Sequence, residues 1–405
     1  MGCGTPPQWK RRGAEAKPVI GRPRLGVLLS LRETNLSPTL MAACGCAVRN
    51  DGERHSRRRC PLSDAIRVMT IDLHALPSAD ARQGHLQELR MLNATPLQPW
   101  TEDRALFLDR SYDELVSTAD CGEAMERLSG GLWWYRRADP SGWRSWVQEW
   151  ALRHPLRDLL HNDPFTHRSY SKPRGFAGDA KMIDLVYFDQ GWANLVGVSN
   201  LGRRLYWRNR ASPGPKAVRE RRDHMAAMLD RVALRKPGAA VMSIAAGHMR
   251  EALISKAVLA GTFREIVAFD QDKEALAAIP AAMGERVKCV HGNIRSIADG
   301  EWHGQRYDFI YAAGLYDYLP ASRATRLTAR LFDLLDEGGE LLVVNFMPDT
   351  YDAGYMESFM DWTLVCRTPD QLFALSEALP PSARSAASIY FLGAPELVYM
   401  KLTRG

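Results

Sequence analysis

The residues best suited to chemistry follow two short apolar runs in the second half of the chain. The first run ends in Ala245, Ala246 and Gly247, and this glycine lets the backbone approach a ligand closely. Free amides at the start of the helix that follows favour an anionic group. Asp270 ends the second run, 23 residues after Gly247, where a carboxylate can accept hydrogen bonds from both hydroxyls of a ribose. The full GxGxxG pattern is missing, so we expect a nucleoside ligand without phosphate.

Residues at neighbouring strand ends extend this predicted nucleoside site. Asn293 can hydrogen-bond an adenine edge and Ile294 can pack on its face, although an Asn after Gly292 suits a plain turn nearly as well. An N-cap is the structural alternative for the acidic pair, and Asp272 fits that role better than Asp270 does. The predicted cofactor-binding residues are Ala245, Gly247, Asp270, Gln271, Asn293, Ile294 and Gly314.

Aromatic and acidic residues follow the fourth apolar run and form the predicted catalytic group. Tyr316, Asp317 and Tyr318 come soon after Gly314 at the end of that run. Small residues followed by aromatic ones suit a cavity that admits a cofactor and then encloses a cation, because a cation over a tyrosine face gains about 0.5–2 kcal/mol. The structural alternative is that one of the two tyrosines packs under the next helix.

These residues need a sheet that brings the ends of several strands together. After Pro237, seven short β-rich runs alternate with helical segments. Nearly apolar strands separated by helices predict a parallel sheet covered on both faces, and the last two runs suit an antiparallel hairpin that closes it. A ligand of such a sheet binds at the carboxyl ends of the strands, where the strand order reverses. The expected strands are residues 240–246, 265–270, 287–290, 307–312, 340–345, 387–391 and 397–402.

The chain divides into three predicted parts. Residues 1–68 mix Pro, Gly, Arg and Ser without helical or strand period, and they are predicted to be a disordered basic leader. A transit peptide would explain this leader, and a translation start at Met41 or Met69 explains it more simply. Residues 69–236 are predicted to form a helical lid and substrate domain, and residues 237–405 the cofactor-binding domain.

Most of the predicted lid is expected to be helical, for example in three segments. Trp143, Trp146 and Trp150 recur at helical spacing, and aromatic residues at this spacing are expected in a packed core rather than around a ligand. The Pro and Gly residues between the segments mark the expected breaks. The expected helices cover residues 103–117, 143–160 and 216–234.

Composition excludes several classes of protein. The 405 residues are 46% hydrophobic and 25% charged, without the roughly 18 consecutive apolar residues of a membrane span, so we expect a soluble protein of enzyme size. Residues 1–68 hold 13 Lys/Arg and 5 Asp/Glu of the chain's 53 and 47, which leaves a nearly neutral body and argues against a nucleic-acid partner. Seven cysteines without a CxxC pair predict no metal, and the missing signal peptide favours the cytoplasm.

Together the site residues resemble a known family. The turn at Gly247, the acidic Asp270, Asn293 and the end of the fourth run are similar to those of class I S-adenosylmethionine-dependent methyltransferases, over residues 237–405. The resemblance implies a Rossmann-like, mostly parallel seven-stranded α/β sheet with an N-terminal helical lid. It also implies S-adenosyl-L-methionine as cofactor and methyl transfer to a small molecule of secondary metabolism or signalling. Four further segments look like the bacterial 3-hydroxypalmitic acid methyl ester biosynthesis proteins: residues 162–166, 172–179, 311–319 and 354–362.

The lid-like segment of that branch supplies the predicted substrate-binding residues. An acceptor carboxylate is ionised at neutral pH and needs no general base, so Arg174 or Lys172 would hold it. The structural alternative is an ion pair between Arg174 and Asp179 that shapes the loop. The predicted substrate-binding residues are Tyr170, Lys172, Arg174, Phe176 and Asp179.

Two features leave the reaction open. His248 and Met249 follow Gly247, where relatives tend to have a small residue and a proline. The fold is also similar to that of azetidine-2-carboxylate synthases, which cyclise the aminobutyryl arm of the cofactor itself. A third hypothesis is a module that binds cofactor or a partner without catalysis, since fold alone does not define chemistry. Residues that could deprotonate the amine in a cyclisation are Tyr170, Tyr316, Asp317 and His248.

Overall fold

A computed structural model describes residues 69–72, 103–118, 121–187, 195–279, 283, 286–302 and 305–405. All of these residues belong to one compact unit, Cys60–Gly405. The predicted leader, residues 1–68, lies outside the described residues. Within the described ranges, no helix combines the length and apolar character needed to cross a membrane.

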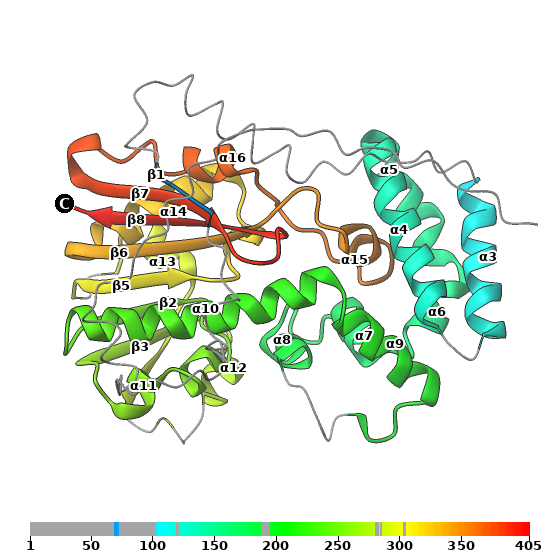
Figure 1. Cartoon of the computed structure of the whole chain (residues 1–405), viewed down its shortest axis with the longest axis horizontal. Helices are drawn as coiled ribbons and strands as arrows, with labels where there is room; N and C mark the ends of the chain where they lie inside the picture. The colour runs from blue at the N-terminus through cyan, green and yellow to red at the C-terminus, as the bar shows by residue number, and fades with distance from the viewer. Residues whose placement is uncertain are drawn as a thin grey trace, which may run out of the picture. The chain divides into compact units, whose positions relative to one another are not determined.

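The unit contains a sheet of eight strands, in the order β1-β7-β8-β6-β5-β2-β3-β4, which lies on the left in Figure 1. Strands β2 to β6 pair in parallel, whereas β8 pairs antiparallel with β6 and β7, and β1 pairs antiparallel with β7. The order reverses between β2 and β5, which makes their carboxyl ends the switch point. The strands are β1 (Met69–Asp72), β2 (Ala240–Ile244), β3 (Glu265–Asp270), β4 (Val287–His291), β5 (Tyr307–Ala312), β6 (Leu335–Phe346), β7 (Arg384–Phe391) and β8 (Leu397–Arg404).

The seven predicted strands are confirmed as the mostly parallel, Rossmann-like sheet of a class I methyltransferase fold. The eighth strand is a correction, because the chain from Met69 onward was predicted to be helical. Met69 instead pairs with Phe391 and Asp72 with Ser388 along the outer edge of β7. The edge of a sheet presents unpaired N–H and C=O groups, and a four-residue strand can satisfy them without a periodic pattern that sequence would reveal.

The helices before β2 agree with the sequence in position but not always in length. The predicted helix over residues 143–160 is broken into three pieces. One break follows Glu149, and the other falls at His154, because Pro155 starts a new helix and holds His154 in an extended conformation (φ −71°, ψ 142°). These helices are α3 (Arg104–Ser117), α4 (Gly122–Ala138), α5 (Pro140–Glu149), η1 (Ala151–Arg153), α6 (Pro155–Leu160), α7 (Pro164–Ser171), α8 (Ala180–Tyr187), α9 (Asn200–Arg210) and α10 (Pro213–Arg235).

The tryptophan stripe is only partly buried. Trp143 and Trp146 belong to the core, but Trp150 is 54% exposed because α5 ends at Glu149 and the chain turns at its C-cap. Of the helices described between and after the strands, all but α14 are short. They are η3 (Arg250–Leu253), α11 (Lys256–Ala260), α12 (Lys273–Ala277), α13 (Ile294–Ala298), η5 (Tyr316–Tyr318), α14 (Ala321–Asp333), α15 (Ala353–Phe359), α16 (Pro369–Ala374) and η6 (Pro381–Ala383).

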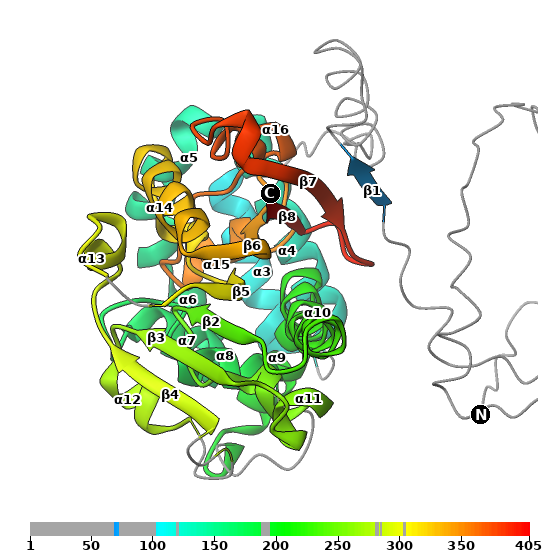
Figure 2. The ribbon, with the colours of Figure 1, turned by 90° about the vertical axis from the view of Figure 1, so that its left-hand side faces the viewer.

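Successive residues of a strand belong alternately to two hydrophobic clusters, one on each face of the sheet. Val241 and Ile266 belong to the cluster that includes α10, whereas their neighbours Met242 and Val267 belong to the cluster that includes α14. This alternation follows from the two-residue period of a strand. Figure 2 shows α13 and α14 on one face of the sheet and α10 and α11 on the other.

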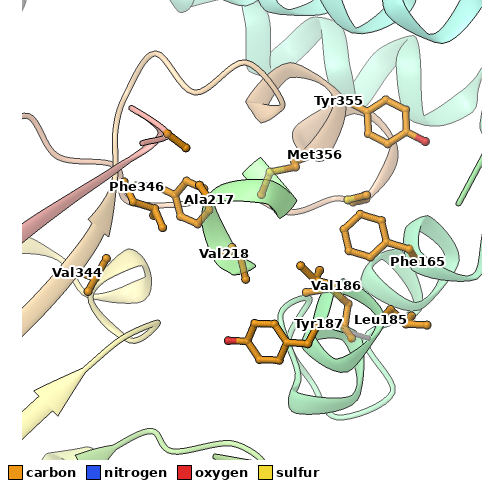
Figure 3. Packing of buried hydrophobic residues seen from close by; sticks show 14 of the residues in the cluster. Phe165, Leu185, Val186, Tyr187, Ala217, Val218, Val344, Phe346, Tyr355 and Met356 are labelled. Atoms are coloured by element: carbon orange, nitrogen blue, oxygen red, sulfur yellow. The ribbon is translucent and has the colours of Figure 1, made fainter. Parts of the chain in front are cut away.

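The α10-side cluster continues from the sheet into the helical layer. Phe165 of α7 and Val186 of α8 gather with Val218 of α10 and Phe346 of β6 (Figure 3). Helix α10 also contacts α8, α9 and α11. The predicted domain boundary after residue 236 stays a prediction, and the apolar core is continuous across it.

Candidate functional site

A cavity of about 790 Å³ lies at the carboxyl ends of β2, β3, β4 and β5, at the switch point of the sheet. Its volume falls within the range of about 300–1,000 Å³ that is usual for small-molecule sites. The predicted lid contributes Gly175, Phe176, Gly178 and helix α8 to the lining. The predicted site residues that line the cavity are Ala245, Gly247, Asp270, Gln271, Asn293, Ile294, Gly314, Asp317, Tyr318 and Phe176.

The turn after β2 has an unusual backbone. Ala245, Gly247 and Met249 have φ values of 53°, 55° and 47°, so three alternate residues lie in the left-handed region. A residue with a side chain pays about 1–2 kcal/mol there, and such strain gathers where a backbone must clamp a ligand. Hydrogen bonds hold the turn: the Ala246 amide donates to the Phe269 carbonyl at 3.1 Å, and the Met249 amide to the Ala246 carbonyl at 2.9 Å.

Asp270 ties this turn to the next strand. Its Oδ2 accepts from the Gly247 amide at 2.8 Å and its Oδ1 from the Asp272 amide at 2.8 Å. Each carboxylate oxygen can accept a second hydrogen bond, so a pair of ribose hydroxyls still has acceptors here. Asp272 is the N-cap of α12, as the sequence suggested, and accepts from the amides of Glu274 and Ala275.

Asn293 has the turn role that was its structural alternative and also lines the cavity. Its side-chain oxygen accepts from the Arg295 amide at 3.0 Å and caps α13. The amide NH₂ of Asn293 is the part of the side chain that can donate to a ligand. Before it stands Gly292, where a Cβ would lie 2.6 Å from the Phe269 ring, so only glycine fits there.

The predicted catalytic group is divided by the structure. Tyr316 is a correction: it is fully buried outside the cavity, and its hydroxyl lies 3.0 Å from Thr328 Oγ1 on α14. Asp317 and Tyr318 do line the cavity. Asp317 accepts from the Phe346 amide at 2.7 Å, and burial raises the pKa of its carboxyl to about 6. Tyr318 accepts a hydrogen bond from Trp362 Nε1 at 3.0 Å.

The structure corrects the predicted set of substrate-binding residues. Four of the five do not line the cavity: Tyr170, Lys172, Arg174 and Asp179. Arg174 forms ion pairs with Asp272 at 2.6 Å and Glu274 at 2.7 Å, and so fastens the lid to the α12 turn. The predicted ion pair between Arg174 and Asp179 is wrong. Arg168 pairs with Asp179 instead, through two hydrogen bonds of 3.0 and 2.7 Å.

The other two misplaced residues have partners on nearby segments. Lys172 pairs with Asp361, and the Tyr170 ring lies 4.6 Å from the His161 ring, centroid to centroid. Neither lines the cavity. Among the predicted substrate-binding residues Phe176 alone contributes to the wall.

Sequence reasoning missed an acidic residue of the lid that holds the β2 turn. Asp184 on α8 accepts from Arg250 Nε and Nη2 at 2.7 Å each, and its Oδ2 lies 2.7 Å from His248 Nδ1. Burial would raise the pKa of Asp184, but Arg250 and His248 outweigh it and lower that pKa. These partners are more than 60 residues apart, and no local pattern signals such a contact.

The inner wall holds further buried charges that the sequence did not mark. Glu251 accepts from the Tyr311 hydroxyl at 2.7 Å, and burial raises the pKa of Glu251. Arg221 of α10 lies beside Ala313 and Gly314. Within the described ranges, no group of three or more His, Cys, Asp or Glu side chains is arranged to hold a metal ion.

Comparisons with known proteins found similarity only among solved structures, since no family model and no curated protein matches. A "possible exported protein" from Bordetella parapertussis is 21% identical over 56% of this chain and 79% of its own (TM-score 0.45). Magnesium protoporphyrin IX methyltransferase from Synechocystis PCC 6803 with bound SAH is 12% identical over 59% and 97% (0.39). N-methyltransferase NodS from Bradyrhizobium japonicum WM9 is 11% identical over 46% and 97% (0.33). The strand order of the sheet by itself defines the class I methyltransferase fold.

Proposed function

We propose that the chain is an S-adenosylmethionine-dependent methyltransferase that acts on a small molecule. The observation that carries this proposal is Asp270, which joins the Gly247 turn to the end of β3 on the wall of the switch-point cavity. An acidic group at this place suits a ribose, and a turn without the phosphate-binding glycines suits a nucleoside that bears no phosphate. Asn293 and Ile294 extend the wall beyond β3 towards the expected position of the adenine.

The rest of the cavity fits the demands of methyl transfer. A sulfonium supplies an activated carbon, so the protein has to align donor and acceptor and exclude water. Three aromatic residues line the cavity: Phe176 from the lid, Tyr318 and Trp362. Aromatic faces favour a cation by about 0.5–2 kcal/mol. These residues therefore enclose the space without forming a covalent bond to either reactant.

A compact acceptor fits better than a long-chain acid held by the lid. Lys172 and Arg174, which were predicted to hold a carboxylate, are both engaged in ion pairs within the protein. Two apolar hollows that share Phe346 and Trp362 with the cavity wall measure about 30 and 10 Å³. Hollows of this size hold one or two water molecules. An acyl chain would have to displace packed helices to enter them.

The engaged lid cations and the small size of the hollows also favour cyclisation of the cofactor as the second candidate, because that reaction needs no separate acceptor. His248 adds a specific feature. Its Nδ1 faces Asp184 at 2.7 Å, and its Nε2 is buried without a hydrogen-bond partner among the described residues. His248 lines the cavity, and a histidine held at Nδ1 in this way can accept a proton at Nε2 from the ammonium of the cofactor or from a hydroxyl acceptor once ligand binding uncovers that nitrogen.

Mass spectrometry of protein incubated with S-adenosylmethionine alone, and then with small acids and alcohols, tests the proposal. S-adenosylhomocysteine that appears only with an acceptor establishes methyl transfer. Methylthioadenosine with a four-carbon imino acid, formed without an acceptor, establishes cyclisation instead. Cofactor binding with no turnover under either condition supports the third hypothesis, a non-catalytic binding module.

Removal of the Asp270 carboxylate tests the cofactor site directly. We expect Asp270→Ala to weaken S-adenosylmethionine binding at least tenfold, or about 1.4 kcal/mol, because both ribose hydroxyls lose their acceptor. Asp270→Asn keeps one acceptor oxygen and should lose less. The exposed Glu337→Ala serves as control and should bind as the wild type does. Equal affinity of all four proteins by calorimetry would remove Asp270 from the site.

A further inference from the structure

A buried arginine on the inner wall of the cavity has no assigned role. Arg221 projects from α10, is 5% exposed, and lines the cavity. Its Nη1 donates to the carbonyl of Ala313 at 2.7 Å, directly after β5. The guanidinium therefore lies at the switch point, where β5 neighbours β2.

Among the described residues, no carboxylate forms a direct ion pair with Arg221. Arg168, Arg174 and Arg250 each pair with an acidic side chain at 2.6–2.7 Å. Arg221 differs: no carboxylate among the described residues forms an ion pair with it, and its Nε is buried without a hydrogen-bond partner. A buried charge is costly unless it is paired, so this arrangement calls for an anion from outside the chain.

Two carboxylates interact electrostatically with Arg221, but each accepts its hydrogen bonds from other donors. Asp317 accepts from the Phe346 amide and from Asn345, and Glu251 accepts from Tyr311. Burial lowers the pKa of Arg221, but Tyr187 and Asp317 outweigh burial and raise that pKa, so the guanidinium stays charged.

Gly314 keeps one side of the guanidinium uncovered. A Cβ at this position would lie 3.6 Å from Arg221 Nη1 and 3.7 Å from Nη2, in van der Waals contact with both nitrogens. Any side chain there would cover the group, whereas glycine leaves it facing the cavity. The planar fork of an arginine matches the two oxygens of a carboxylate.

We propose that Arg221 is the receptor for a carboxylate group bound in the cavity. The proposal deepens the proposed function and rests on it where the carboxylate belongs to the cofactor. Strands β3, β2 and β5 are consecutive neighbours, so a nucleoside held by Asp270 at β3 crosses the Gly247 turn to reach Arg221, about 10 Å away at the usual strand spacing. The amino-acid arm of S-adenosylmethionine ends in a carboxylate. A carboxylate of the acceptor is the other source.

Calorimetry with two nucleosides identifies the source. S-adenosylhomocysteine carries the amino-acid arm and methylthioadenosine lacks it. If Arg221 holds the cofactor carboxylate, Arg221→Met weakens S-adenosylhomocysteine binding at least thirtyfold and leaves methylthioadenosine binding unchanged. If it holds an acceptor carboxylate, both nucleosides bind as in the wild type, and hexanoate binds the S-adenosylhomocysteine complex of the wild type but not that of the variant.

Controls separate this role from a structural one. Arg235, the last residue of α10, pairs with Glu340 and does not line the cavity, so Arg235→Met should bind every probe as the wild type does. Arg221→Lys keeps the charge but loses the fork, and it should bind the affected probe with intermediate affinity. If Arg221→Met does not fold, Arg221→Lys carries the comparison.

One pattern would overturn the proposal: nucleoside affinities equal in the wild type and both Arg221 variants, together with no hexanoate binding that depends on Arg221. Failure of the proposed function is a separate result, because the wild type would then bind neither nucleoside. In that case hexanoate is titrated into the ligand-free proteins, and binding by the wild type but not by Arg221→Met still supports a carboxylate receptor. Equal hexanoate binding, or none, overturns it.

Discussion

At the scale of single residues, Asp317 shows how one side chain can serve both the fold and the site. Its Oδ1 accepts from the Phe346 amide and from Asn345 Nδ2, and so joins the η5 turn to the end of β6. It also lines the cavity, where burial raises its pKa to about 6. The carboxyl is thus held where its protonation changes near neutral pH.

This raised pKa predicts a defined pH dependence of stability. A carboxyl that binds its proton more tightly in the folded state contributes stability fully below its unfolded pKa of about 3.8, and this contribution is lost as pH rises through about 6. Asp317→Asn keeps the Oδ1 acceptor and does not titrate. From pH 4 to 7 we expect the wild type to lose about 1–3 kcal/mol of unfolding free energy relative to this variant.

Denaturant unfolding at a series of pH values measures this difference. Exposed Asp333→Asn should follow the wild-type curve and serves as control. Parallel curves for the wild type and Asp317→Asn would show that Asp317 is as easily ionised in the folded chain as in the unfolded one.

Whether a residue of the candidate site could be predicted depends on how far along the chain its contact partners lie. Asp270, Asn293 and Gly314 could be found from sequence, because apolar strands end visibly and a parallel sheet gathers their carboxyl ends. Asp184 and Arg221 could not, since each acquires its partners only when helices from earlier in the chain pack on the sheet. The partner of Asp179 was missed for another reason: two arginines lie near it in sequence, and spacing does not choose between them.

At the scale of elements, the turn that joins β2 to η3 combines an unfavourable backbone with a place on the cavity wall. Ala245 and Met249 adopt left-handed conformations that glycine would adopt freely. From the sequence, the missing glycines argued only against a phosphate-bearing ligand. The structure adds that residues with side chains take left-handed conformations in this turn, and the chain bears their strain.

Glycine substitutions at adjacent positions measure that strain. Ala245→Gly removes about 1–2 kcal/mol of left-handed strain and adds about 0.4–1 kcal/mol of unfolded-state entropy, so we expect a net stabilisation of up to about 1.5 kcal/mol. Ala246→Gly is the matched control, since its φ is not positive, and it should destabilise by about 0.4–1 kcal/mol. Denaturant unfolding of both variants is the measurement. Equal destabilisation would mean that Ala245 carries no strain.

At the scale of the whole molecule, the sheet was predictable because its strands are apolar, short and separated by helices, which leaves few alternatives to an open α/β arrangement. Strand β1 was not predictable. It has four residues, and it pairs with a strand more than 300 residues away along the chain. The helical layer was predicted by type, but its breaks at Pro155 and its continuous core with the sheet emerge only from packing.

Two truncations test what β1 contributes to the folded unit. Removal of residues 1–68 leaves β1 in place, and we expect unchanged stability and unchanged cofactor turnover. Removal of residues 1–72 also deletes the strand and exposes the outer edge of β7 from Ser388 to Phe391. Backbone hydrogen bonds contribute about 0.5–1.5 kcal/mol each, so the loss should be about 1–3 kcal/mol, seen as a lower midpoint of thermal unfolding. If the two truncated proteins have the same melting temperature, β1 adds nothing to the stability of the sheet. If removal of residues 1–68 alone already lowers stability or turnover, residues before Met69 belong to the folded unit.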